Sequence, residues 1–517
     1  MKKWLIGIVA AVVVAGGGFY WALAVYPTRL FRGAVDGALA SLPAGFSGSY
    51  GGATYSLLDG TGTLTGLAIH GPDANKLDLA IDTLTLVHPA TDLGPAWAHA
   101  AADPTKIQPD LQLPVADAIT VKGVSFRDAD DRLTLASGRI SHPRLYPWAL
   151  LHPGVPSLAQ ARAALMEHAH APTLADVIPL LRVEAHWMLG FGYDDYEAEG
   201  LMALTALPAS GATPAASAAY TIQKMTSGRY DRGNTASSAL EGLTMKSDLF
   251  GSFGIAAAKI EGLELEKPLT AFLANQDATP DMLDGLSLKS LTYGPMSVQG
   301  EVGSPSVIGT FALANVVFEH GLLTSADLAF TGLRVNREQL PNLNAVAAFE
   351  QLGLDAMTLN LNLGYRWDLA QGRMTVENAT FEVQELGALS LSFEVEGAGS
   401  PQDLLAKARL VHAVLRYKDA SLADRALKIA ATEKGTDPDD LRQQLIATAQ
   451  QMVTAQGATA ATAATARAVS DFLSAPRSLA IELAPKQPVP LMALLAAGSL
   501  PPDRLVATFG LSIAANR

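Results

Sequence analysis

Cysteine is absent from the 517 residues of this chain, which excludes disulfides, thiolate nucleophiles and cysteine metal ligands. Charge is scarce as well: charged residues make up 17% of the sequence, and the formal net charge is -13 at pH 7. Lys and Arg form no cluster that would give one face a strong positive potential. We therefore expect no nucleic-acid partner.

Catalytic and cofactor-binding motifs are lacking too. The sequence contains no G-x-S-x-G nucleophile elbow, no P-loop and no H-E-x-x-H zinc motif. The glycines between Gly60 and Gly66 have neither the spacing nor the context of a dinucleotide-binding turn, and they predict a hairpin turn. We therefore predict a non-enzymatic protein without catalytic residues, metal site or cofactor, because an enzyme would need a dispersed site.

The sequence is rich in hydrophobic residues, which occur in short segments. Hydrophobic residues make up 49%, and 45 Gly and 29 Pro supply turns without low-complexity runs. A chain of this length can bury a large core and allows more than one domain. The composition therefore predicts a folded, turn-rich protein, and the N-terminus has to indicate its compartment.

An uncharged run extends from Trp4 to Tyr26, after two lysines. As a helix of about 34 Å it matches the hydrocarbon core of a bilayer. Aromatic residues stand at both ends of the run, where interfacial anchors belong; they include Trp4, Phe19, Tyr20 and Trp21. The lysines favour a cytoplasmic N-terminus. The sequence thus predicts one transmembrane anchor, residues 1–27, in the inner membrane, with the body in the periplasm.

A cleaved signal peptide is the alternative interpretation of this segment. Ala22-Leu23-Ala24 is an A-x-A sequence of the kind that signal peptidase cuts, and Arg29 and Arg32 weaken the charge bias. Under both interpretations, the part of the chain that follows this segment is exported from the cytoplasm. The apolar residues that follow recur at helical spacing and predict a short amphipathic helix up to Pro43.

The clearest strand pattern lies between Met357 and Gly397. Large apolar residues alternate there with small or polar ones, which places the large groups on one face of an extended strand. In the first strand they are Met357, Leu359, Leu361, Leu363 and Tyr365. After a turn at residues 368–372 the alternation resumes, shifts its phase before Phe381 as across a bulge, and continues to Val395. The stretch predicts a meander with one apolar face.

The rest of the body repeats a hairpin theme. A short strand, usually with a glycine before an apolar residue, is followed after a polar loop by a second alternating strand. The paired segments are residues 66–69 with 77–86, 123–126 with 133–140, 242–245 with 260–265, and 316–318 with 328–335. A hairpin cannot bury its apolar face alone, so the units are expected to join one long sheet or to close against a second sheet.

Helical periodicity interrupts this theme. It is found at residues 158–169, 173–181 and 338–352, and it dominates residues 421–433, 437–456 and 459–474. Three features predict a helix start at Asp437. The Asp437 side chain is suited to cap the helix, and Pro438 fits the first helical position. The negative charges of the two aspartates that follow interact favourably with the positive N-terminal end of the helix dipole. Alternating residues at 479–483 and 506–513, around a helical piece at 491–497, predict that the end of the chain returns to the sheet. Residues 45–52 and 209–219 are predicted to form a turn and a loop.

Together these patterns predict a mainly β fold: a long antiparallel meander of repeated hairpins that forms a curled sheet or groove, with a C-terminal helical subdomain. The predicted domains are the anchor at residues 1–27, a β-hairpin domain with helical insertions at 28–399, and a helical subdomain with terminal strands at 400–517.

Two polar clusters contain the residue types of a metal or acid–base site. His168 and His170 stand two positions apart beside a glutamate, but such positions point apart on a helix, so we interpret them as a polar helix end. Residues 194–199 include four carboxylates, a group that in other spacings binds calcium or shares a proton. Glu197 and Glu199 fall on one face of an extended segment, which predicts a solvated strand face.

An N-terminal anchor followed by loosely repeated amphipathic hairpins, as at residues 66–86 and 242–265, resembles the AsmA-like envelope proteins. The resemblance is architectural and covers residues 1–397; the YdgA-like group of anchored periplasmic proteins is the alternative. It implies a β-taco sheet curled around an apolar groove, and a role in lipid movement or outer-membrane homeostasis. The helical region at 421–474 departs from a simple groove along the whole length.

The leading hypothesis is a non-enzymatic envelope protein that binds or conveys lipid acyl chains along an apolar β groove lined by the residues between Met357 and Tyr365. In the second hypothesis the same apolar faces fill a closed β core, and the protein is a periplasmic scaffold that binds another envelope protein. The third is a hydrolase of envelope polymers, for which the carboxylates of residues 194–199 are the candidate site.

Overall fold

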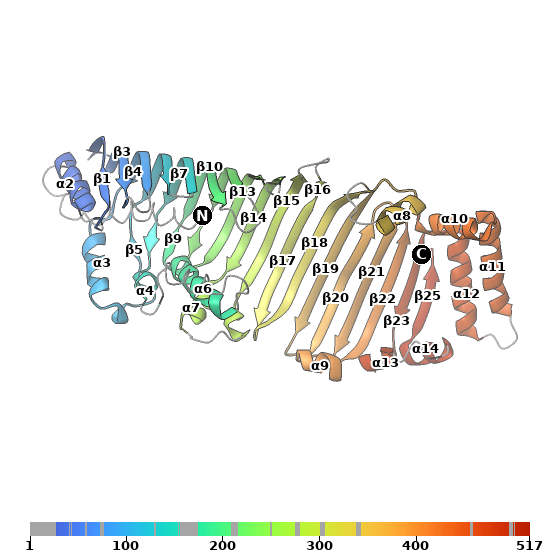
Figure 1. The fold of residues 1–517 in the computed structure, drawn as a ribbon. Helices are drawn as coiled ribbons and strands as arrows, with labels where there is room; N and C mark the ends of the chain where they lie inside the picture. The colour runs from blue at the N-terminus through green and yellow to red at the C-terminus, as the bar shows by residue number, and fades with distance from the viewer. Residues whose placement is uncertain are drawn as a thin grey trace. The chain divides into compact units, whose positions relative to one another are not determined.

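The computed structural model describes residues 27–40, 42, 44–56, 59–72, 77–128, 131–152, 155, 174–207, 216–248, 251–274, 280–299, 306–337, 343–454, 459–495, 500 and 502–516. Strands hold 51% of the described residues and helices 29%, so the protein is mainly β. Figure 1 shows the arrangement of these strands and helices. Its strands form a long antiparallel sheet that is not closed. The chain divides into two compact units. Unit 1 comprises Met1–Pro305 and Phe318–Leu322, and unit 2 comprises Ser306–Val317 and Leu323–Arg517.

The long strands of unit 1 pair antiparallel in chain order. They are β3 (Thr61–His70), β4 (Asp78–Val87), β6 (Ala118–Arg127), β7 (Asp131–Ser141), β10 (Asp195–Leu207), β11 (Ala216–Ser227), β13 (Asn234–Ser247), β14 (Gly251–Glu264) and β15 (Ser287–Gln299). At the first edge, β1 (Ser47–Ser49) and β2 (Gly52–Ser56) pair with β3. The first three predicted hairpins are confirmed as β3 with β4, β6 with β7 and β13 with β14.

A second row of short strands lies beside the ends of the long ones. Its members are β5 (Leu113–Pro114), β8 (Arg144–Leu145), β9 (Phe191–Tyr193) and β12 (Tyr230–Asp231), which pair in that order. Each is separated by only a few residues from a long strand, so the chain bends there. Figure 1 shows helices beside this row; they are α3 (Leu93–Ala102), α4 (Pro147–Leu150), α6 (Leu174–Leu189) and α7 (Glu266–Ala274).

A glycine with positive φ kinks several long strands of unit 1 at mid-length. These are Gly66, Gly123, Gly200 and Gly242, with φ of 61°, 61°, 66° and 63°, each followed by Leu or Val and each missing from its ladder. The buried face shifts by one residue across the kink, from Leu64 to Leu67 in β3. A Cβ on Gly123 would lie 2.0 Å from Asp82 Oδ2. The recurring glycine of the sequence therefore marks a bulge-like kink within a strand.

The core of unit 1 is formed by the inner faces of β3, β4, β6 and β7. Leu64 is 1% exposed there and Ile81 2%. The predicted amphipathic helix is confirmed as α2 (Pro27–Ala40), whose Phe31 enters this core. Arg32 Nε donates a hydrogen bond to the carbonyl of Ala53 in β2 at 3.1 Å. Helix α2 thus binds a backbone atom of the edge strand β2, which protects this edge of the sheet.

Unit 2 contains β16 (Ser306–Ile308), most of β17 (Thr310–Glu319) and an antiparallel series that begins with β18. The series is β18 (Leu322–Asn336), β19 (Ala356–Asp368), β20 (Arg373–Val383), β21 (Gly387–Glu396), β22 (Arg409–Asp419), β23 (Ser478–Leu483) and β25 (Leu511–Ala515). The short β24 (Val489–Pro490) pairs with the start of β22. In the fourth predicted hairpin, the Thr324 hydroxyl of β18 donates to the Val317 carbonyl of β17 at 3.2 Å.

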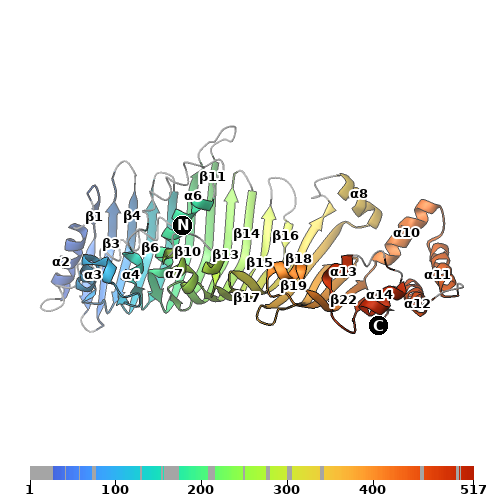
Figure 2. The same ribbon diagram turned by 90° about the horizontal axis from the view of Figure 1, so that it is seen from below.

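The helices of unit 2 lie in the connections between its strands, as Figures 1 and 2 show. They are α8 (Leu343–Leu352), α9 (Pro401–Ala406), α10 (Leu422–Lys434), α11 (Pro438–Thr454), α12 (Ala460–Ser474), α13 (Leu491–Leu495) and α14 (Pro502–Phe509). The predicted helices of residues 421–474 are confirmed. Asp437 caps α11 as predicted, because its Oδ1 accepts a hydrogen bond from the Asp439 amide at 2.8 Å.

Some predictions were wrong. Residues 506–513 are not one strand, because α14 continues to Phe509 and β25 begins at Leu511. Pro502 fits the first helical turn, and Gly510, with φ 60°, ends the helix. The predicted turn at residues 45–52 contains β1, which pairs with β3. The predicted loop at 209–219 overlaps β11, which begins at Ala216 and pairs with β10.

The predicted anchor residues Trp4, Phe19, Tyr20 and Trp21 lie outside the described residues, as do His168, His170 and the helix predicted at 158–169. Within the described ranges, no helix combines the length and apolar character needed to cross a membrane. The anchor therefore stays a prediction.

Candidate functional site

All the residues predicted to line a groove lie on one face of β19. Met357, Leu359 and Tyr365 are half-buried, whereas Leu361 is 39% exposed and Leu363 37%. The intervening Asn360 and Asn362 belong to the opposite face by strand alternation. The structure therefore brings the five predicted residues together, and it leaves the middle of their row exposed.

The same apolar face continues across the next two strands. Leu361 is paired with Phe381 of β20, and Phe381 with Leu389 of β21. Phe381 is 51% exposed, Leu389 44% and Leu391 36%. We call the exposed set Leu361, Leu363, Phe381, Leu389 and Leu391 the open face. Contiguous exposed side chains of this size are unusual on a soluble surface and often mark a binding site.

Helix α8 covers one end of the strands that carry the open face. Phe349 of α8 is buried in a cluster with Leu354 and Leu386, against Met357 and Val383 of the strands. Arg425 of α10 donates hydrogen bonds to the carbonyls of Leu352 and Gly353 at the end of α8. Cations suit the carbonyl end of a helix, so Arg425 holds α8 over this end of the sheet.

Helices α9 and α13 cover the other end of the same strands. The cluster there is centred on Val395 and Leu410, which are 0% and 2% exposed. Leu404 of α9 and Leu491 and Leu494 of α13 pack against it, together with Trp367, Met374 and Phe393 of the strands. The Trp367 indole donates a hydrogen bond to the carbonyl of Ala398. The apolar face is therefore closed at both strand ends and exposed between them.

Helix α12 bounds a third side. Tyr417 of β22 is paired with Leu389 of the open face, and the ring of Phe472 from α12 lies 6.0 Å away from it, centroid to centroid, in an edge contact. Burial, followed by the hydrogen bond from its hydroxyl to Asp419, raises the pKa of Tyr417. The phenol therefore stays neutral, and the open face is framed on three sides by helices.

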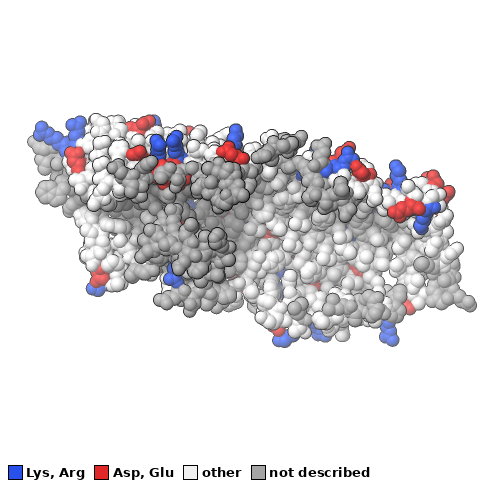
Figure 3. Space-filling view, viewed as in Figure 1, with Lys and Arg blue, Asp and Glu red and all other residues white. Residues whose placement is uncertain are grey.

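Two ion pairs of these strands lie on the face opposite to the open face. Arg366 of β19 donates to both carboxylate oxygens of Asp327 in β18, at 2.8 and 2.7 Å. These hydrogen bonds lower the pKa of Asp327. His412 and Glu482 pair across β22 and β23 at 3.0 Å. In Figure 3, charged side chains on the visible face of unit 2 gather mainly along its margins.

Carboxylates of residues 194–199, the acidic cluster singled out in the sequence, form ordinary ion pairs in unit 1. Lys224 Nζ lies 2.5 Å from Glu197 Oε1 and 3.7 Å from Glu199 Oε1, across β10 and β11. Asp194 is bound by Arg144 at 2.9 Å. In the part of the chain that the structure describes, no group of three or more His, Asp or Glu side chains is arranged to hold a metal ion. The interpretation of Glu197 and Glu199 as a solvated strand face is confirmed, because their side chains are about half exposed.

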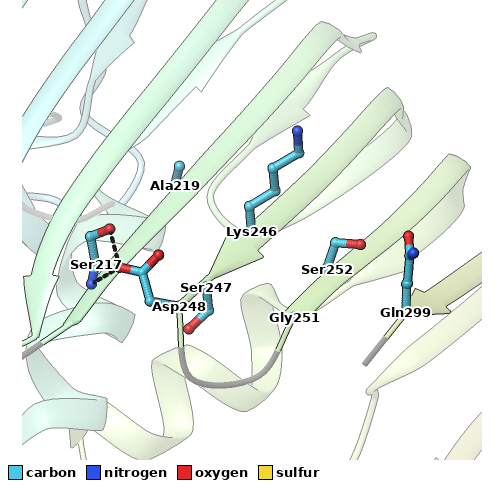
Figure 4. Close-up of a pocket in the computed structure, with 8 residues that line it drawn as sticks. All are labelled: Ser217, Ala219, Lys246, Ser247, Asp248, Gly251, Ser252 and Gln299. Atoms are coloured by element: carbon cyan, nitrogen blue, oxygen red, sulfur yellow. Dashed lines mark hydrogen bonds between the residues drawn. The ribbon is translucent and has the colours of Figure 1, made fainter. Parts of the chain in front are cut away.

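A shallow pocket of about 350 Å³ lies at one end of β11, β13, β14 and β15 in unit 1 (Figure 4). Its acidic group, Asp248, accepts hydrogen bonds from the amide and hydroxyl of Ser217 at 2.9 and 2.7 Å. These bonds lower the pKa of Asp248. Since the carboxylate is already engaged and Lys246 points outward (Figure 4), the pocket assembles no reactive group.

Sequence reasoning missed part of the site. Phe381, Leu389 and Leu391 were assigned to the apolar face of the meander but were not included among the residues predicted to line the groove. Their alternation contained the signal, because residues in phase on adjacent strands share a face. No comparable signal marked Phe472, whose place against Tyr417 depends on the packing of α12.

The fold and the open face define a class of protein: a mainly β chain with an unclosed antiparallel sheet and an exposed, helix-framed apolar surface. A protein-family model described as an uncharacterized protein matches residues 380–516, from within β20 to the end of β25. No curated protein and no solved structure matches the chain.

Proposed function

We propose that this protein is a membrane-anchored envelope protein in which the open face forms an apolar groove that binds or conveys lipid acyl chains. The observation that carries the proposal is the exposure of large apolar side chains on three adjacent strands, at 36–51%, between helices that close both strand ends. An acyl chain satisfies such a surface because it buries apolar area without needing hydrogen bonds.

The N-terminal sequence supports the same proposal. An uncharged run from Trp4 to Tyr26 that anchors the chain in the inner membrane would hold the periplasmic body near a source of lipid. The resemblance to AsmA-like proteins implies the same association of anchor, curled sheet and lipid. In this proposal the protein supports envelope homeostasis by handling lipid and has no enzymatic activity.

The test is Leu361→Asp, with Asn362→Asp as the matched control on the opposite face of β19. In an open groove, Leu361→Asp places a carboxylate in a solvated site, so the variant should fold with a thermal midpoint near that of the parent. It should retain several-fold less lipid after gentle purification, measured by extraction and mass spectrometry. Asn362→Asp should retain as much lipid as the parent.

Two results would contradict the proposal. If Leu361→Asp folds and retains the parent's lipid, this strand does not handle lipid. If it aggregates or loses several kcal/mol of stability, as expected for a carboxylate in an apolar interior, the face is closed in solution.

A scaffold with a closed β core is the second candidate, and one observation in unit 1 favours it. Leu64, Ile81 and Val124 are 1–2% exposed, so the corresponding face of that unit is filled by protein. A protein partner that co-purifies in place of lipid would support this candidate.

A further inference from the structure

Within unit 2, the open face belongs to a longer row of apolar side chains that crosses the sheet. The row passes from Leu361 through Phe381 and Leu389 to Tyr417, and then to Leu479 of β23 and Ala515 of β25. Adjacent strands lie about 4.8 Å apart. A chain lying along this row therefore advances by about that distance at each strand, and it meets Tyr417 directly after Leu389.

At Tyr417 the row passes under α12. The Phe472 ring stands at 65° to the Tyr417 ring, with its centroid 6.0 Å away. Helix α12 packs against β25 and β23, and the Asn516 side chain at the end of β25 donates to the carbonyl of Asp471, next to Phe472, at 2.8 Å. The ring is thereby held where the exposed part of the row ends.

We propose that Phe472 forms the closed end of the acyl-binding groove and sets the maximum length of the chain that the groove accepts. This inference rests on the proposed function and adds a specificity-determining residue to it. The groove then has sides at α8 and at α9 with α13, and a stop at α12, so a bound chain ends against the Phe472 ring.

An acyl chain fits this bounded surface better than a peptide does. Strands β19, β20 and β21 are paired along both edges, so they offer no free backbone to an added peptide strand. The residues of the open face carry no charge and no hydrogen-bonding side chain. Tyr417, at the stop, directs its hydroxyl to Asp419.

The experiment uses the full-length protein, delipidated in detergent and offered an equimolar mixture of lauric, palmitic, stearic and behenic acids. The acids retained after gel filtration are quantified by mass spectrometry. The parent should retain the shorter acids and discriminate against those beyond a cut-off. Phe472→Ala should move that cut-off toward longer acids, by a chain extension of about 4.8 Å, one strand spacing.

Val469→Ala is the matched control. Val469 lies on α12 one turn before Phe472 and is 37% exposed, so its truncation should leave the parent's cut-off unchanged. Phe472→Leu keeps apolar volume against Tyr417 and should give an intermediate shift. It also serves as the test variant if Phe472→Ala does not fold, as judged by its thermal midpoint.

The outcomes separate the two proposals. If the parent retains acids and neither Phe472 variant changes the cut-off, Phe472 is not the stop, and the proposed function stands. An equal shift in Val469→Ala would also overturn the assignment, since the effect would belong to α12 as a whole. If the parent retains no acid, or a second copy or another protein occupies the open face in native mass spectrometry, the proposed function fails and this inference fails with it.

Discussion

Side chains of the open face are only partly buried, so each contributes less hydrophobic stabilisation than full burial would give. Fully burying a Leu or Phe side chain contributes about 1.5–3 kcal/mol, yet Leu361 is 39% exposed and Phe381 51%. Ile81 is in a comparable strand position of unit 1 and is 2% exposed. An acyl chain on the open face would recover part of the missing burial, which supplies the driving force for the proposed binding.

On the other face of these strands, the pair of Asp327 and Arg366 predicts an acid-sensitive contribution to stability. Hydrogen bonds from Arg366 lower the pKa of Asp327. A carboxyl whose pKa is depressed by folding stabilises the protein above its unfolded pKa of about 3.9, and this contribution is lost as the pH falls through the lower, folded-state pKa. The parent's thermal midpoint should therefore fall on acidification below about pH 4, and Asp327→Asn should show a weaker dependence.

Asp355→Asn is the control for this pH series. The Asp355 side chain is 95% exposed, and its ion pair with Arg337 is longer, at 3.6 Å, so its contribution should be screened by solvent. This variant should keep the parent's dependence on pH. Superimposable curves for Asp327→Asn and the parent would show that the Asp327 pair does not contribute.

The conformation of the long strands of unit 1 depends on the glycine kinks at their mid-length. Gly123 has φ 61° in the middle of β6, and a Cβ there would meet the Asp82 carboxylate at 2.0 Å. Because a left-handed conformation costs an ordinary residue about 1–2 kcal/mol, Gly123→Ala should lower the free energy of unfolding by at least about that amount. Chemical denaturation measures the change.

Gly37→Ala provides the comparison within unit 1. Gly37 lies inside α2, and a Cβ at this position would meet nothing within 4 Å. Alanine in a helix interior is more favourable than glycine by about 0.5–1 kcal/mol, so this variant should be more stable than the parent. A Gly123→Ala variant as stable as the parent would show that β6 can lose its kink at no cost.

For the whole molecule, the prediction that comes first is export of the body. A reporter fused after residue 60 should be active outside the cytoplasm, because the run from Trp4 to Tyr26 is long enough to span a bilayer. The full-length protein should resist extraction by carbonate and by salt. A shortened soluble form that begins near Val25 would replace the anchor by a cleaved signal and leave export unchanged.

The domain boundary predicted near Gly399 concerns separate folding of the C-terminal region and stays a prediction. Strand β22, beyond that boundary, pairs along its length with β21, before it. The family model also begins before the boundary and ends after it, since it matches residues 380–516. These two observations favour an evolutionary unit that includes the last strands of the open face together with α9, α12 and α13, three of the helices that frame it.

The sequence alone determined the strands of the first three predicted hairpins and of the meander, the C-terminal helices and the apolar side of the meander. Alternation in β19 identified which face is apolar, because strand geometry sends successive side chains to opposite sides, and Asp437 with Pro438 identified the start of α11. The phase shift before Phe381 was confirmed as a register irregularity in β20. Around Val506, helix and strand compete in a short apolar segment, and a strand was wrongly predicted.

Only the tertiary structure decided which apolar faces are covered. Leu64 and Leu361 lie in strands of similar pattern, yet one is 1% exposed and the other 39%. Alternation reports that one side of a strand is apolar, whereas exposure depends on the layer that packs on that side. Strands β3, β4, β6 and β7 and helix α2 fill the core around Leu64. Helices α8, α9, α12 and α13 contact the margins of the apolar face that carries Leu361, and they leave Leu361 exposed. Contacts between residues distant in sequence, such as Phe472 with Tyr417, set that difference.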